Sequence, residues 1–151
     1  SKLLGPEQDP NIVEYPSICI DTDIVEEIAR HDFPASSLRR IILTAGKILP
    51  EDSLSVHTDE LCQFPTLESL LPHLLAYFSI LASCLHTSGN PSASFMFMNR
   101  TYSYTASLVE MASQFEWSHV LEYHTLYMNK RQHEMRRGNY SGWGPVDLDI
   151  F

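Results

Sequence analysis

The sequence predicts an all-α fold, a bundle of about five helices preceded by an extended N-terminal arm. Three observations support this class. Apolar residues recur at helical spacing in several segments, recognisable cap and stop signals separate those segments, and no segment shows the strict alternation of a half-buried strand. A chain of 151 residues, 44% hydrophobic and 19% charged, suits one globular domain.

Residues 1–20 contain three prolines and few helix signals, so we expect an extended arm. Asp23 and Glu26 have the spacing of a capping box, which predicts a short helix over 22–32. Pro34 breaks the chain, and Ser36 or Ser37 then caps a second predicted helix that reaches about Ile48.

Thr66 is the expected cap of the third helix, which reaches His86 and carries apolar residues over most of its circumference. The stretch "SGNPSAS" marks the next boundary. Gly89 ends one helix, Asn90 caps the following one, and Pro91 occupies its first position. This fourth helix is predicted to run to about Phe115.

The fourth helix is apolar on two faces. One face comprises Phe97, Tyr104, Leu108, Met111 and Phe115. The other comprises Phe95, Met98, Tyr102, Ala106 and Val109. A helix with two apolar faces sits between neighbours or keeps one face for a partner. We therefore predict a partner-binding or assembly face formed by Phe95, Met98, Tyr102 and Val109.

The fifth helix is predicted from about Glu116 to Gly138, with acids early and bases late, an order that complements the helix dipole. It completes a predicted bundle domain over 21–138. Residues 139–151 form a turn-rich tail, in which "GPVDLDIF" resembles the start of a further helix with Pro145 in its first turn.

The formal net charge of −9 repels nucleic acid as a whole, so binding to a phosphate backbone would need a local basic patch. Cys19, Cys62 and Cys84 are an odd number without zinc-site spacing, which favours reduced thiols and an intracellular protein, cytoplasmic or nuclear. The longest apolar run is too short and interrupted for a membrane span, so no membrane association is expected.

No sequence signature of an enzyme or cofactor site is visible. Glu116 and His119 have the spacing of a di-iron ligand pair, but a second such motif is absent, so neither a metal nor another cofactor is expected. His124 falls on the apolar seam of the fifth helix and is interpreted as a core histidine. An enzyme with a pocket near His124 remains an alternative.

The basic end of the fifth helix is the second candidate contact region. Its residues are Lys130, Arg131, Arg136, Arg137, Tyr140 and Trp143. They could contact phosphates, with the aromatic rings stacking on bases, or an acidic protein partner. The same charges could instead hold the acidic N-terminal half within the fold. We expect Arg131 to pair with a carboxylate of that half or stack on an aromatic ring, and Trp143 to fold back over the helix.

The segment "FPTLESLLPHLLAYFSILASCL" reads as an aliphatic helix and is followed by a connecting helix and a series of shorter signals. These signals comprise Trp117, Val120, Leu121, Tyr123, His124, Asn129, Lys130, Arg131, Gly138, Tyr140, Gly142 and Trp143. On these residues the chain over about 64–144 resembles segments of Gag-like, capsid-type proteins of fungal retroelements. The resemblance implies a non-enzymatic helical domain that self-associates. The two apolar faces of the fourth helix, the charge segregation between the halves of the chain and the lack of a catalytic constellation give the leading hypothesis. It is a protein-interaction or self-assembly domain that forms a homo-oligomer or binds a protein partner. The alternatives are a nucleic-acid-binding module and an enzyme.

Overall fold

A computed structural model describes residues 18–19, 21–43 and 63–150, and the described chain is helical. The elements in order are β1 (Ile18–Cys19), α1 (Thr22–Ala29), the 3-10 helix η2 (Ala35–Arg40), β2 (Ile42–Leu43), α3 (Leu67–Thr87), α4 (Pro91–Gln114) and α5 (Trp117–Arg136). The predicted all-α bundle is confirmed, with a two-residue antiparallel pairing of β1 with β2 as an addition. The expected arm over 1–20 lies almost wholly outside the described residues.

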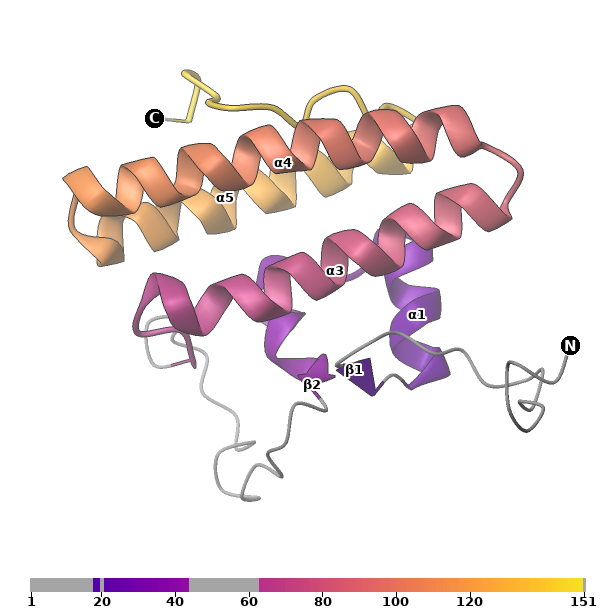
Figure 1. Ribbon diagram of the computed structural model, residues 1–151, viewed down its shortest axis with the longest axis horizontal. Helices are drawn as coiled ribbons and strands as arrows, with labels where there is room; N and C mark the ends of the chain where they lie inside the picture. The colour runs from indigo at the N-terminus through magenta and orange to yellow at the C-terminus, as the bar shows by residue number, and fades with distance from the viewer. Residues whose placement is uncertain (1–17, 20, 44–62, 151) are drawn as a thin grey trace, which may run out of the picture.

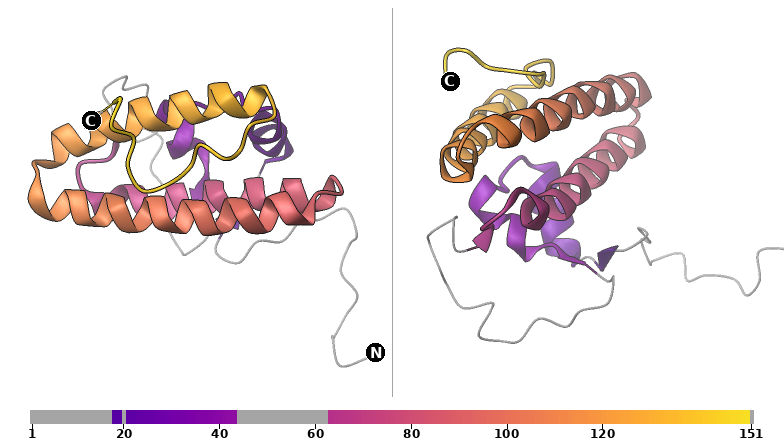
Figure 2. Two further views of the ribbon diagram at one scale, coloured as in Figure 1. Left: turned by 90° about the horizontal axis from the view of Figure 1, so that it is seen from above. Right: turned by 60° about the vertical axis from the view of Figure 1, so that its left-hand side comes forward.

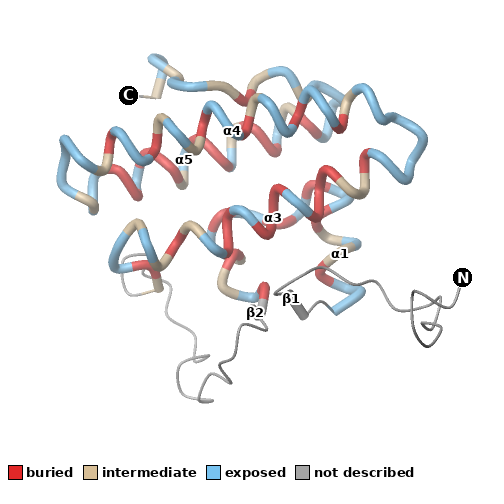
Figure 3. The backbone as a smooth tube through the Cα atoms, viewed as in Figure 1, coloured by how far each residue is buried: buried red, intermediate tan, exposed pale blue. Residues whose placement is uncertain are grey.

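The three long helices form the frame of the molecule. Figure 1 shows α4 and α5 together above α3, with α1 packed below α3. The 3-10 helix η2 packs against both α3 and α5. The views in Figure 2 show the chain after α5 returning across α4 and α5. Buried residues recur along the inner sides of the long helices in Figure 3, while one side of α4 remains exposed.

The predicted boundaries of the long helices are confirmed. Thr66 and Ser69 form a reciprocal capping box at the start of α3. The side chain of Asn90 caps α4, and Pro91 is its first residue. After α5, Gly138 adopts a φ of +86°, the left-handed conformation in which glycine carries no steric penalty.

Two predicted details of the first helix are corrected. The cap is Asp21, whose side chain accepts a hydrogen bond from the Asp23 amide, so the proposed Asp23–Glu26 capping box is wrong. The helix also ends at Ala29, before the expected residue 32. His31, two residues later, takes a φ of +63°, an uncommon conformation for a residue with a side chain.

The predicted second helix is also corrected. Its described part is a six-residue 3-10 helix, after which Ile41 is extended and β2 begins. Side chains of α5 fix this segment: Gln132 hydrogen-bonds both backbone groups of Phe33, and Asn129 accepts from the amide of Ala35. The remainder of that prediction, to Ile48, lies outside the described residues.

The core is rich in aromatic residues. The largest fully buried side chains include Trp143, Tyr77, Tyr104, Tyr127 and Phe97. Helix α3 contributes more buried residues than any other described element. By length and composition α3 could also cross a membrane, with a mean hydropathy of 1.4 over a window that is 56% buried inside the fold. Core helices of other proteins meet the same criterion, so this property is weak evidence for a span.

The segment after α5 contains turns and no helix between residues 137 and 150, so the further helix suggested by "GPVDLDIF" is not formed there. We call residues 139–150 the C-terminal segment. It is held by α5: the amide of Gly144 donates to the Tyr127 hydroxyl at 2.7 Å, and the amide of Asp147 donates to the Tyr123 hydroxyl at 2.9 Å. These bonds fix the path of the segment across the bundle.

Candidate interaction surface

Large apolar side chains are exposed along one side of α4. Phe95 is 71% exposed, Met98 56%, Tyr102 77% and Val109 44%. These four residues, predicted as an assembly face, are called the α4 stripe below. Of the ten exposed large hydrophobic residues in the described part of the chain, five lie on α4 when Met96 is included. The exposed apolar surface is therefore concentrated on one helix.

The separation of the two faces of α4 follows from helical geometry. At 3.6 residues per turn, the four stripe positions span about 60° of the helix circumference. Most residues predicted for the other face (Phe97, Tyr104, Leu108 and Met111) are buried against the bundle. Phe115 is the exception at 47% exposed, because it lies beyond the last helical residue in extended conformation.

The side of α3 that meets α4 also carries an exposed apolar residue. The Ser94 hydroxyl donates a 2.8 Å hydrogen bond to the carbonyl of Ala82, which shows where α4 meets α3. Leu75 is two turns before Ala82, so both lie on the same side of α3. Leu75 is 49% exposed. Leu75 therefore adds exposed apolar surface on the side of α3 that faces α4 at Ala82.

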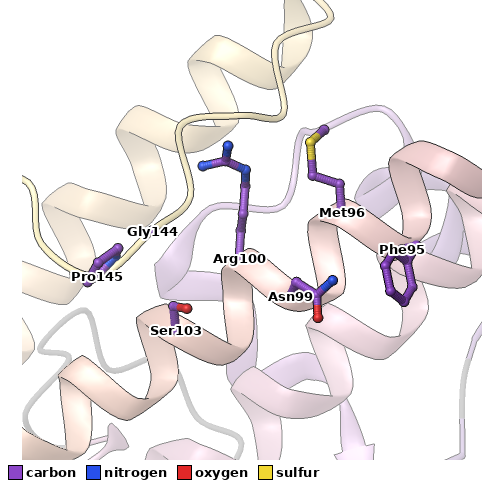
Figure 4. A pocket seen from close by; sticks show the side chains of 7 residues that line it. All are labelled: Phe95, Met96, Asn99, Arg100, Ser103, Gly144 and Pro145. Atoms are coloured by element: carbon purple, nitrogen blue, oxygen red, sulfur yellow. The ribbon is translucent and has the colours of Figure 1, made fainter.

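A pocket of about 410 Å³ adjoins the α4 stripe on the side of the C-terminal segment. Its lining residues are Phe95, Met96, Asn99, Arg100, Ser103, Gly144 and Pro145. Figure 4 shows Arg100 extending from α4 toward the C-terminal segment, with Met96 one turn before it. Phe95 belongs to both the pocket and the stripe, so the two features form one continuous surface.

Arg100 gives this pocket a positive charge. Its Nη1 donates to the carbonyls of Ser141 at 3.0 Å and Trp143 at 3.2 Å, and its buried Nε has no hydrogen-bond partner among the described residues. Both partners are neutral. Within the described chain no carboxylate forms an ion pair with Arg100. The pocket therefore combines an apolar wall with an uncompensated guanidinium.

The sequence did not predict this pocket. The signal was present, since Arg100 is the single basic residue of a largely apolar helix. Its proximity to the C-terminal segment depends on how that segment folds back, which helical spacing does not show. The sequence therefore predicted the stripe without the adjoining pocket.

Two residues of the predicted basic contact region are buried. Arg131 donates to Glu134 at 2.9 Å, to Asp147 at 3.1 Å and to the carbonyl of Gly142 at 2.8 Å. Of the two contacts expected for Arg131, the aromatic one is present, with the guanidinium 4.8 Å from the Tyr127 ring centroid. Its carboxylate partners belong to α5 and the C-terminal segment instead of the N-terminal half. Trp143 is 1% exposed, so its ring is not available to stack on a base.

Most of the other residues in that region also have partners within the chain. Lys130 pairs with Asp147 at 2.9 Å, and Arg136 lies 3.4 Å from Asp32. The Arg136–Asp32 contact joins the basic end of α5 to the acidic N-terminal half, which is one of the arrangements expected from the sequence. The Tyr140 hydroxyl lies 2.6 Å from Nε2 of His31. Arg137 is exposed.

His124 is buried between α4 and α5, as its position on the apolar seam predicted. Its Nδ1 lies 2.7 Å from the Tyr104 hydroxyl. Burial lowers the pKa of His124 to about 4, so the ring is neutral at physiological pH. The pocket beside Arg100 does not include His124. The geometry therefore gives a substrate no route to this imidazole through that pocket.

Glu116 and His119 are both exposed at the start of α5. No group of three or more His, Cys, Asp or Glu residues in the described ranges is arranged to hold a metal ion. Cys84 is a half-buried free thiol whose pKa is raised by burial, which makes it a weak nucleophile. Among the described residues, the α4 surface is the strongest candidate for function.

Comparisons with known proteins yield no relative. No protein-family model matches the chain, and neither the curated proteins nor the solved structures contain a match.

Proposed function

We propose that the protein is a helical interaction domain that self-associates through the α4 stripe. The observation that carries this proposal is the alignment of Phe95, Met98, Tyr102 and Val109 on one exposed side of a well-packed helix. At these exposures the four side chains leave on the order of 500 Å² of apolar surface in water. Patches of this size on folded domains commonly mark interaction sites.

The composition of the α4 stripe favours a second copy of the chain as the partner. Its four residues carry no charge, and Phe95 and Val109 each lie seven residues from Tyr102. Two antiparallel α4 helices related by a twofold axis near Tyr102 would therefore bring apolar side chains opposite one another along the whole stripe. A twofold interface requires such a self-complementary patch.

The expected affinity is modest. A stable dimer usually buries about 800 Å² on each partner. The α4 stripe supplies about 60% of that area, and Leu75 and the neighbouring pocket add to it. We therefore expect a dimer with a dissociation constant in the micromolar range.

The structure offers less support for binding to nucleic acid. Lys130, Arg131 and Arg136 are neutralised by carboxylates within the chain, and Trp143 is buried. Self-association also agrees with what the resemblance of residues 64–144 to Gag-like proteins implies. A capsid-like assembly role belongs to the same proposal and rests on that resemblance.

Sedimentation equilibrium over a concentration series tests the proposal. The wild-type chain should shift from monomer toward dimer as concentration rises, and Tyr102→Glu should remain monomeric because it places a charge in the centre of the stripe. Leu126→Glu is the matched control, since Leu126 is 52% exposed on α5. A wild-type chain that stays monomeric at several hundred micromolar would overturn the proposal.

A further inference from the structure

The pocket between α4 and the C-terminal segment is largely separate from the α4 stripe. Of its lining residues, only Phe95 belongs to the stripe. At 100° per residue, Arg100 lies about 170° around α4 from the middle of the stripe. Figure 4 shows Arg100 reaching toward the C-terminal segment, which borders the pocket at Gly144 and Pro145. Self-association through the stripe therefore gives the guanidinium of Arg100 no counter-ion.

The guanidinium of Arg100 is held along one edge, and the donors of another edge are not used within the fold. Its Nη1 donates to the carbonyls of Ser141 and Trp143, which fix the position of the group. Its Nε is buried without a hydrogen-bond partner, and no described group accepts a hydrogen bond from Nη2. The edge formed by Nε and Nη2 is one that binds a carboxylate through two parallel hydrogen bonds. Arg100 therefore offers a preoriented fork for an anion.

The carboxylates of the described chain do not balance this charge. None of them forms an ion pair with Arg100. Glu110 is the single acid of α4, and ten residues of helix place it about 15 Å from Arg100 along the axis. Asp147, two residues after Pro145, is bound by Lys130 at 2.9 Å and Arg131 at 3.1 Å. The charge at the pocket therefore favours an anionic ligand.

The rest of the lining favours an apolar group next to that anion. Phe95 supplies an aromatic ring, and Met96 supplies a flexible thioether that adapts to ligands of different shape. Asn99 and Ser103 are neutral and polar. The volume of about 410 Å³ falls within the range of small-molecule sites in proteins and suits a ligand of about ten non-hydrogen atoms.

We infer that this pocket binds a small monocarboxylic acid with an aromatic or branched aliphatic group. Its carboxylate is bound by Nε and Nη2 of Arg100, and its apolar group packs on Phe95 and Met96. A carboxylate is favoured over a phosphate because its two oxygens match a single guanidinium fork, and a chain of net charge −9 repels a dianion more strongly. For a ligand of this size we expect a dissociation constant of about 1 mM. This binding does not depend on self-association, because the carboxylate contact lies away from the α4 stripe.

A titration with phenylacetate, followed by methionine methyl NMR at low protein concentration, tests the site. The Met96 methyl signal should shift as phenylacetate is added, while the signals of Met128 and Met135, buried elsewhere, stay fixed. Phenylacetamide keeps the ring and lacks the charge, so it should bind about tenfold more weakly or less. Acetate keeps the charge and lacks the ring, so it should also bind more weakly. Equal binding of phenylacetamide or acetate would overturn the inference, because the charge or the apolar wall would then contribute nothing.

A substitution at Ser103 blocks the site without removing Arg100, which also holds the C-terminal segment. Ser103 is exposed one turn after Arg100, so the new carboxylate of Ser103→Glu can reach the guanidinium and take the place of the ligand. This variant should lose the shift that phenylacetate produces at Met96. Ser113→Glu, exposed on α4 outside the pocket, is the matched control and should bind like wild type. The inference is overturned if Met96 in wild type does not respond to a large excess of phenylacetate, or if Ser103→Glu binds it equally well. Either result would leave dimerisation through the α4 stripe standing.

Discussion

The hydroxyl of Tyr104 lies 2.7 Å from Nδ1 of His124, in the buried layer between α4 and α5. The Tyr104 ring also stacks on Tyr127, with ring centroids 4.1 Å apart. These contacts join the inner face of α4 to α5 through specific polar and aromatic geometry. They fix the rotation of α4 about its axis, so that Tyr102 and Met98 point away from the bundle.

Stability should depend on the protonation of His124. Burial lowers its pKa from 6.5 to about 4. Between these values the unfolded chain binds more protons than the folded one, so this contribution to stability is lost as the pH falls through the window. We expect wild type to lose roughly 2–3 kcal/mol more than His124→Phe between pH 7 and pH 4.

Urea unfolding at several pH values measures this difference. Burial also lowers the pKa values of His31 and His73, so the wild-type curve alone contains contributions from other groups as well. The difference in the free energy of unfolding between wild type and His124→Phe isolates the contribution of His124. Parallel stability curves for the two proteins would contradict the assignment.

Arg131 should be difficult to replace even by lysine. Its guanidinium reaches Glu134, Asp147 and the carbonyl of Gly142 together, and an ammonium cannot span this geometry. We expect Arg131→Lys to lower the free energy of unfolding by about 2–4 kcal/mol. Arg137→Lys, at an exposed position one turn beyond Glu134, is the matched control and should be nearly neutral in thermal denaturation. Equal melting temperatures for both variants would refute this role.

Gly142 should resist a substitution that Gly144 tolerates. A Cβ on Gly142 would lie 2.1 Å from Oε1 of Glu134, whose other oxygen is held by Arg131. Gly144 has no atom within 4 Å of the corresponding position. Gly142→Ala should therefore cost about 1 kcal/mol by displacing the Glu134–Arg131 pair, and Gly144→Ala should be close to neutral. The opposite order of melting temperatures would show that the segment packs differently.

The two tryptophans should differ in their contribution to stability. Trp143 is fully buried and contacts Phe78, Phe97 and Tyr104 edge-on. Trp117 is half-buried, with its indole N–H bonded to the carbonyl of Phe64. Trp143→Ala should cost about 3–5 kcal/mol and Trp117→Ala distinctly less. Chemical denaturation compares them, and an equal or larger loss at Trp117 would contradict the placement of Trp143.

The sequence predicted the long helices well because their signals are local. Thr66, the Asn90-Pro91 pair and Gly138 determine helix ends through bonds and conformations within a few residues. The 3-10 helix η2 was missed because its segment is held by Gln132, about a hundred residues away. A distant side chain that competes for backbone groups leaves no periodic signal in the segment it fixes.

The same distinction applies to the candidate surfaces. The exposed face of α4 followed from helical spacing alone, and the four predicted residues are all exposed. The partners of the basic residues could not be predicted, because Asp147 reaches Lys130 and Arg131 through the return of the C-terminal segment. With the C-terminal segment in place, most of the basic residues predicted as a nucleic-acid contact region form ion pairs within the fold.

Methionine methyl NMR tests the central claim, self-association through the α4 stripe, most directly. The chain has five methionines, of which Met98 lies in the stripe and Met128 and Met135 are buried elsewhere in the core. On dilution from high to low micromolar concentration, the account predicts that the Met98 methyl signal shifts while those of Met128 and Met135 stay fixed. A Met98 signal that does not change with concentration would contradict it.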